Sequence, residues 1–281
     1  MATFTNKATL SYNGTLTDSN TVTGTVTQTL TVQKNALSDT YASDSTLTYV
    51  ISLVNTGSSA LGGLALSDDL GGYPFGGGTV YPLAYVDGSL AYYVNGVLQP
   101  TPTVTAGPPL SVDGINVPAG GNAVVIYQAT VTAYAPLDQE DSILNTVTVT
   151  GLAETVTATE TVSTLDEPIL SITKCLSPNT VPENGSLIYT FVIRNDGNTA
   201  TVATDDLTVT DLFDPILTLT SVTLNGTPLS EGSGYTYNEA TGLFQTVSGV
   251  IVVPAATYTQ QPDGSYEITP GFATLVVNGT I

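Results

Sequence analysis

The stretch Thr46-Leu-Thr-Tyr-Val-Ile-Ser-Leu53 decides the fold, because apolar side chains occupy every second position of it. This two-residue period is typical of a β-strand that buries one of its faces. The same alternation returns further along the chain in Ser186-Leu-Ile-Tyr-Thr-Phe-Val-Ile193. We predict a strand in both places, and the residues that share the buried face are Leu47, Tyr49, Ile51 and Leu53 in the first and Leu187, Tyr189, Phe191 and Ile193 in the second.

Further matches on either side of these strands make them part of an internal repeat. The matches occur in the same order in both copies, and one connecting loop differs in length. Short alternating strands separated by Gly, Pro and Asn turns are typical of an Ig-like β-sandwich. We therefore predict an all-β protein with two tandem Ig-like β-sandwich modules, module one over residues 29–165 and module two over residues 166–281. The matched segments are Leu30–Lys34 with Leu170–Lys174, Asn55–Gly57 with Asn195–Gly197, Leu64–Asp68 with Leu207–Asp211, and Val117–Gly120 with Val253–Ala256.

The composition excludes several classes of function. The 281 residues include 4 Lys and Arg, 24 Asp and Glu and no His, so the net charge is -20. Nucleic acid and anionic membrane surfaces both require a basic footprint, so neither is expected as a partner. Without His there is no His-based catalytic triad or zinc-protease motif, and no glycine-rich phosphate loop is present. We expect no turnover enzyme, no cofactor and no insertion into a membrane.

The modules differ in how their last strand is supplied. Asn145-Thr-Val-Thr-Val-Thr-Gly151 lies in the predicted closing strand of module one, residues 143–151, whereas the sequence given reaches Ile281 without a matching segment in module two. A match stands at the other end, as Asn6-Lys-Ala-Thr-Leu-Ser-Tyr12. We therefore expect residues 1–28 to provide a donor strand and a linking strand. The residues that share the donor face are Phe4, Asn6, Ala8, Leu10 and Tyr12.

Three partners for this donor strand remain open. It can complete module two of another copy, fold back onto its own module two, or pair with an edge of module one. The segments that follow Tyr12 and Gly151 have nearly equal lengths, which favours a neighbouring subunit as the acceptor. Such a head-to-tail contact gives an open filament unless the rotation closes a ring. The partner expected for the protein is therefore the protein itself, as a homopolymer.

The repeat resembles the bacterial cell-surface conserved-repeat family, domain of unknown function eleven. The motifs that carry the resemblance are the strands that end in lysine and in aspartate, the Tyr-x5-Asn-x-Gly pattern and the asparagine-led closing strand. The resemblance covers nearly the whole chain. It implies Ig-like modules at a cell surface or in an appendage, and it names no enzyme activity. The sequence departs from the family pattern in the order of its strands, because module two has no closing strand of its own and a matching strand stands before module one.

Three polar residues fall on the apolar faces of each module, where an unpaired charge is costly. Lysine, asparagine and an acid at such places resemble the groups that form intramolecular isopeptide bonds in Gram-positive surface proteins. Burial makes the amine nucleophilic, and an acid kept protonated polarises the amide. The alternative is a lysine that reaches the rim of the module and pairs with the aspartate. The candidate residues are Lys34, Asn145 and Asp68 in module one, and Lys174 and Asp211 with Asn6 in module two.

The alternative function is a monomeric surface adhesin or carbohydrate-binding module that uses the Tyr- and Gly-rich loop Gly72–Pro82.

Acidic clusters can bind calcium, although solvated acidic loops are the simpler interpretation and no metal is expected. No secretory signal peptide is visible, so for a surface protein we consider release as a spore appendage. Five Asn-Gly pairs, which begin at Asn13, Asn95, Asn184, Asn225 and Asn278, predict tight turns.

Overall fold

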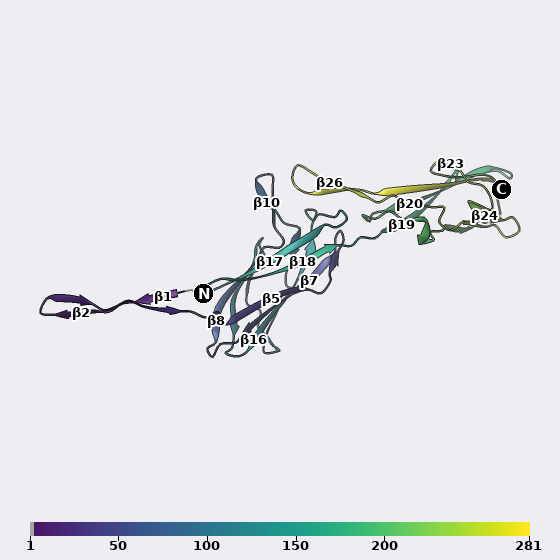
Figure 1. Cartoon of the computed structure of the whole chain (residues 1–281). Helices are drawn as coiled ribbons and strands as arrows, with labels where there is room; N and C mark the ends of the chain where they lie inside the picture. Colours follow the sequence, from purple (N-terminus) through teal and green to yellow (C-terminus); the bar gives the residue numbers. More distant parts are fainter. Residues whose placement is uncertain (1–2) are drawn as a thin grey trace. The chain divides into compact units, whose positions relative to one another are not determined.

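The computed structural model describes residues 3–281 and consists of β-strands, with one turn of 3-10 helix at Ala203–Asp205. The chain forms two compact units, drawn in Figure 1. The first is built mainly from the chain up to Pro136 together with Ser142–Ser163, and the second from Thr164–Gln261 together with Tyr266–Ile281. Across residues 3–281, no helix is both long enough and apolar enough to cross a membrane.

Module one is a sandwich of two antiparallel sheets, and each sheet has six strands. In the first sheet the order is β13-β12-β16-β7-β5, and β11 also pairs with β16. Its strands are β5 (Leu30–Ala36), β7 (Thr46–Asn55), β11 (Leu83–Tyr85), β12 (Ala91–Val94), β13 (Val97–Gln99) and β16 (Asn122–Val131). In the second sheet the order is β14-β15-β8-β17-β18-β6. Its strands are β6 (Thr40–Tyr41), β8 (Leu61–Asp68), β14 (Thr103–Thr105), β15 (Leu110–Val117), β17 (Ser142–Thr150) and β18 (Val156–Thr164). A small hairpin, β9 (Tyr73–Phe75) with β10 (Gly78–Val80), stands apart from both sheets.

The inward faces of these strands follow the predicted alternation. Along β5 and β7 every second side chain is buried, including Leu30, Val32, Tyr49 and Ile51. On the opposing sheet, β8 and β17 bury alternate side chains in the same way. The two apolar faces pack on each other, so the Ig-like sandwich class predicted from the sequence is confirmed.

Module two has the same plan with fewer strands in its second sheet. The first sheet runs β19-β20-β28-β22-β23, and the second contains three strands in the order β21-β25-β24. A separate hairpin, β26 with β27, lies between the segment matched to Val117–Gly120 and the last strand, β28. The strands are β19 (Leu170–Ser177), β20 (Ser186–Asn195), β21 (Thr210–Leu212), β22 (Thr218–Leu224), β23 (Thr227–Pro228), β24 (Tyr235–Asn238), β25 (Leu243–Thr246), β26 (Thr257–Gln260), β27 (Tyr266–Thr269) and β28 (Gly271–Thr280).

The segment that precedes module one forms a two-part hairpin. The strand β1 (Thr3–Asn6) pairs with β4 (Val22–Thr25), and β2 (Thr9–Tyr12) pairs with β3 (Thr15–Asp18). The predicted donor residues Phe4 to Tyr12 thus form one arm of a hairpin. Large apolar side chains of both arms are exposed, for example Leu10 at 68% and Leu16 at 69%. Residues 1 and 2 of the predicted donor segment lie outside the described residues.

Most of the predicted Asn-Gly turns are present, and one is not. Asn13, Asn95, Asn184 and Asn225 have positive φ angles, as tight turns at these positions require. Asn278 instead lies inside β28, so the turn predicted there is wrong. That stretch pairs with β20 on one side and β22 on the other, and two ladders of backbone hydrogen bonds outweigh the local turn preference.

Candidate functional site

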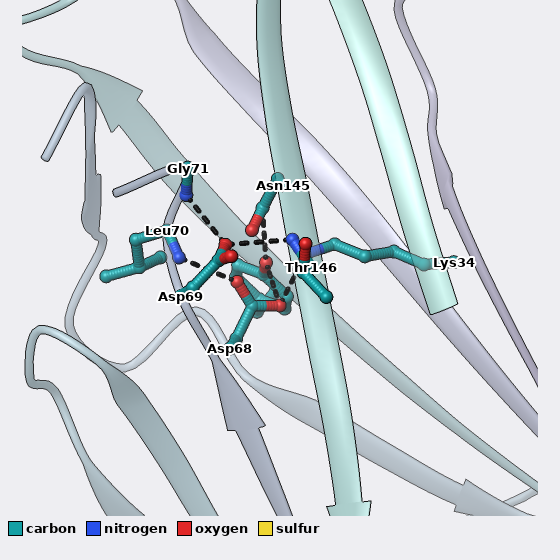
Figure 2. Close-up of polar contacts among 8 residues, drawn as sticks. Lys34, Asp68, Asp69, Leu70, Gly71, Asn145 and Thr146 are labelled. Carbon is teal, nitrogen blue, oxygen red and sulfur yellow. Dashed lines mark hydrogen bonds and ion pairs between the residues drawn. The ribbon is translucent and has the colours of Figure 1, made fainter. Parts of the chain in front are cut away.

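The core of module one contains an ion pair between its two sheets. Lys34 extends from β5 and Asp68 from the end of β8, and Nζ lies 2.6 Å from Oδ2. Figure 2 shows both side chains converging next to Asn145 of β17. The exposed fractions of the lysine and aspartate side chains are 0% and 2%. The pair is therefore fully removed from water, and its charges depend on each other for compensation.

A tyrosine and an asparagine complete the cluster. The hydroxyl of Tyr127 donates a hydrogen bond to Oδ2 of Asp68 at 2.7 Å, and the backbone N–H of Leu70 donates to Oδ1 at 3.1 Å. Asn145 donates from Nδ2 to the hydroxyl of Tyr127 at 3.2 Å. Oδ1 of Asn145 is buried and accepts no hydrogen bond from any residue in the described part of the chain. A buried carbonyl oxygen without a donor is uncommon in a packed core, and among the described residues the hydroxyl of Tyr49 is also buried without a hydrogen-bond partner.

The neighbouring Asp69 fixes the closing strand against this cluster. Its Oδ1 accepts hydrogen bonds from the backbone N–H of Thr146 at 2.8 Å and of Gly71 at 3.0 Å, as Figure 2 shows. Thr146 directly follows Asn145, so this contact sets how far along the sheet the amide of Asn145 lies. The position of Asn145 beside Lys34 is thereby determined by backbone contacts as well as by its own side chain.

Burial changes the proton affinities of the cluster. It lowers the pKa of the Lys34 ammonium, and the Asp68 carboxylate partly opposes this change. Burial also raises the pKa of the hydroxyls of Tyr49 and Tyr127, so both stay protonated in the usual range of pH. A lysine with a lowered pKa yields the neutral amine more readily, and the neutral amine is the nucleophilic form.

Module two contains the corresponding lysine and acid in a different setting. Lys174 of β19 forms an ion pair with Asp211 of β21, but the exposed fractions of these side chains are 40% and 16%. The ammonium lies 4.4 Å from the ring centroid of Tyr189, which corresponds to Tyr49. Tyr127 pairs with Tyr49 across the sheet, whereas Val277 pairs with Tyr189. The acid of module two therefore has neither the tyrosine hydroxyl nor the asparagine of module one.

The second sheet of module two ends at an unpaired edge. In module one β8 pairs with β15 on one side and β17 on the other. The matching strand β21 pairs with β25, and within residues 3–281 no strand pairs with its other edge. Beside it every side chain of β19 is exposed, although β5 buries alternate ones. A groove of about 160 Å³ opens here, and its apolar lining is Leu170, Ile172, Ile193, Leu207 and Val209.

The structure therefore brings together Lys34, Asp68 and Asn145, and separately Lys174 and Asp211. Asn6, the third residue proposed for module two, is exposed in β1, where it pairs with Val22. Tyr127 belongs to the first cluster and was not predicted from the sequence. The sequence does contain a signal for it. Tyr127 lies on the apolar face of the alternating strand Asn122–Val131, and a tyrosine hydroxyl buried on such a face needs a hydrogen-bond partner.

Within residues 3–281, no three acidic or cysteine side chains gather in an arrangement that holds a metal ion. Cys175 follows Lys174 on β19 and is exposed with a free thiol.

Comparison with known proteins gives structural likenesses at low sequence identity. No protein-family model matches the chain, and no curated protein matches it. The pilus backbone protein RrgB of Streptococcus pneumoniae is 10% identical with a TM-score of 0.35, over 90% of this chain and 50% of that one. The major pilin subunit BcpA of Bacillus cereus is 14% identical with a TM-score of 0.35, over 96% of this chain and 73% of that one. The collagen-binding domain of a Staphylococcus aureus adhesin is 14% identical with a TM-score of 0.30, over 50% of this chain and 99% of that one. The chain thus spans about half the length of the pneumococcal pilus backbone structure.

Proposed function

We propose that this protein is the structural subunit of an extracellular filament, in which each subunit donates its N-terminal segment to module two of the next. One observation carries the proposal. In the part of the chain that the structure describes, no strand takes beside β21 the place that β17 fills beside β8, and a segment with the side-chain pattern of β17 stands exposed at residues 4–12.

The side chains of the two segments correspond one by one. Ile143, Asn145, Val147 and Val149 point into module one from β17. Phe4 and Asn6 of β1, Ala8 between the strands and Leu10 of β2 stand at the same spacing, with Asn6 in the place of Asn145. Their insertion would cover the groove beside β21 and give its edge a row of backbone partners. Burial of these side chains supplies roughly 5 to 10 kcal/mol before the entropy cost of ordering.

An exposed donor and an open acceptor on the same chain favour continued growth. Each added subunit fills one groove and presents another, so the contact is heterologous and does not saturate in a dimer. Both exposed surfaces are apolar, although the protein is strongly acidic, with a net charge of -20. Mutual repulsion between acidic bodies slows assembly at low ionic strength, and salt should accelerate it.

Removal of the donor tests this proposal directly. Full-length protein should form filaments visible by negative-stain electron microscopy, whereas the variant that lacks residues 1–28 should remain monomeric. The same variant, mixed with full-length protein, should shorten the filaments, because it accepts a donor and has none to give. Full-length protein that stays monomeric at all concentrations would contradict the proposal and favour the adhesin alternative, and assembly of the deleted variant would contradict it too.

The cluster in module one supports a covalent lock as part of this function. The neutral Nζ of Lys34 would attack Cγ of Asn145, form a C–N bond and release the amide nitrogen as ammonia. A protonated Asp68 would donate a hydrogen bond to Oδ1 of Asn145, which accepts none within the described residues. The proton that the attacking amine loses would pass by way of Asp68 to the departing amide nitrogen, so ammonia leaves and Asp68 ends with as many protons as it began with. The net change is loss of one ammonia molecule, so neither an oxidant nor a cofactor is required.

Between subunits, Asn6 would take the part of Asn145 beside Lys174 and Asp211. Insertion of the donor would exclude water from this lysine, and loss of hydration is what makes its amine reactive. Intact-mass measurement of the monomer should show the loss of one ammonia in wild type and none in Asn145→Ala. Filaments of the wild type should resist boiling in SDS, and filaments of Asn6→Ala should dissociate into monomers. Full-mass monomers together with SDS-sensitive filaments would contradict the covalent lock and leave the filament itself in place.

A further inference from the structure

We infer that the docking unit is the whole hairpin of residues 3–25, and that its second arm pairs with residues 179–181 of the accepting module two. This inference rests on the proposed donor-strand assembly and identifies a second contact within it. A single donor strand would use β1 and β2 alone and leave β3 and β4 as a linker in solution.

Module one shows what a completed module contains. Its closing strand β17 pairs with β18 along nearly its full length, and β18 in turn lies beside β6. The backbone N–H of Ser163 donates to the carbonyl oxygen of Asp39 at 3.0 Å. Val162 and Thr164 of β18 are both buried. In module one, therefore, two strands, β17 and β18, complete the second sheet between β8 and β6.

Within residues 3–281, no strand of module two takes the place of β17 or of β18. The segment that corresponds to Asp39 and β6 is Asn179–Val181, since the repeat runs without a gap from Lys34 and Lys174 to Tyr49 and Tyr189. These residues form no strand, whereas Thr40–Tyr41 do. Val181 packs against the core of module two but stays only partly buried. One inserted strand would fill the place of β17 and leave this second edge without a partner.

The N-terminal hairpin matches the pair β17 and β18 in its register. Phe4 pairs with Gly24 and Thr3 with Thr25, as Ile143 pairs with Val162 and Ser142 with Ser163. Nearly the same length of chain closes both hairpins, and the N-terminal one is already formed before docking. A preformed hairpin lowers the ordering cost of association, because its second arm needs no separate alignment. By this correspondence Thr25 takes the place of Ser163 and donates its N–H to the carbonyl oxygen of Asn179 in the acceptor.

A proline at residue 25 distinguishes docking of the whole hairpin from docking of a single donor strand. In Thr25→Pro the outward N–H is lost, while the pairing of β1 with β4 is kept, because Ser163 directs its own N–H away from β17. The matched control Thr25→Val keeps the N–H. Loss of this hydrogen bond should raise the critical concentration for assembly about tenfold in Thr25→Pro and leave it unchanged in Thr25→Val. Equal critical concentrations for the two variants would overturn the hairpin model.

Hydrogen exchange of the wild-type filament gives a second readout. Docking of the hairpin should protect the amides of residues 179–181 and 22–25 on assembly, in addition to those of β1, β2 and β21. Protection confined to β1, β2 and β21 would overturn the hairpin model while the donor-strand filament stands. If wild type fails to assemble, or the variant without residues 1–28 still assembles, the proposed function fails, and the two failures are thus distinguishable.

Discussion

Modules one and two place the same pair of residues in opposite environments. Lys34 and Asp68 are fully buried, whereas Lys174 and Asp211 remain partly exposed at matching positions of matching strands. Local sequence does not explain the difference, because both lysines close the same pattern, Leu-x-Val/Ile-x-Lys, and lie within their strands β5 and β19. The burial of the lysine is therefore decided by the strands that cover it, β17 and β18 in module one.

This difference shows that the core of module two is packed although, within residues 3–281, no strands cover its lysine as β17 and β18 do in module one. Module two retains a packed centre around Phe213, Phe244 and Leu275, which is buried without any donor. Its open side is confined to β19, β21 and the groove between them. A module of this kind can fold first and accept further strands afterwards, as the proposed donor-strand assembly requires.

The largest expected effect comes from making module two resemble module one within one chain. Residues 3–25 can be moved from the N-terminus to a position after Ile281, joined by a flexible linker as long as the segment between β16 and β17. Because β28 corresponds to β16, this order places the donor where β17 follows in module one. We expect a monomer whose module two is more stable. Burial of the donor contributes roughly 5 to 10 kcal/mol. The entropy cost of ordering the donor lowers the net gain in unfolding free energy, which urea denaturation measures.

The control for this rearrangement carries Leu10→Asp in the moved segment. A charge at this place should prevent insertion into the apolar groove and leave the stability of module two unchanged. If the rearranged chain still forms filaments, or if both versions unfold at the same urea concentration, the correspondence between the modules is wrong.

The second effect compares the two lysines directly. Lys34→Met leaves the Asp68 carboxylate buried without a cation, and loss of one partner of a buried pair costs about 3 to 5 kcal/mol. Lys174→Met, measured in the variant without residues 1–28, should cost no more than about 1 kcal/mol, because this pair is partly hydrated. Urea denaturation followed by tyrosine fluorescence checks both values. Equal losses of unfolding free energy in the two variants would contradict the inference that the strands covering Lys34 distinguish module one from module two.

The alternation of residues was sufficient to predict the sandwich class and the buried faces. It identified the inward positions of β5, β7, β8 and β17, because a two-residue period fixes which side chains share a face. It also placed Lys34, Asp68 and Asn145 on inward faces, and the structure shows them in one cluster. Periodicity within a strand carries this information locally, so no knowledge of the partner strands was needed.

Other features depend on partners that a strand pattern does not specify. The exposure of Lys174 follows from the vacant edge of β21, and the hairpin of residues 3–25 follows from pairing between its two arms. The role of Tyr127 arises because its hydroxyl meets Asp68 of the other sheet. Contacts between sheets depend on how the two layers are placed, which is not encoded in the spacing of either strand alone.

A smaller effect tests the tyrosine that distinguishes the clusters. Tyr127→Phe removes the hydroxyl that donates to Asp68 and accepts from Asn145, which makes module one more like module two at this point. We expect a loss of about 1 to 3 kcal/mol in the unfolding free energy of module one, because two buried hydrogen bonds disappear. Tyr93→Phe, on the neighbouring strand β12, is the matched control and should cost less than about 0.5 kcal/mol. A loss for Tyr127→Phe no greater than for this control would show that the hydroxyl does not hold the carboxylate.

The smallest effect concerns Cys175, the neighbour of Lys174 on β19. Because side chains alternate along a strand, the thiol points away from the face that carries Lys174 and its groove. A docked donor would therefore cover the lysine and leave the thiol outside the sealed core. Cys175→Ser should change the unfolding free energy by less than about 0.5 kcal/mol and leave filament assembly unaffected, with or without a reducing agent. Filaments that shorten in Cys175→Ser, or that dissociate on reduction, would show that subunits are joined by a disulfide at this surface and that the faces of β19 have been assigned in the wrong order.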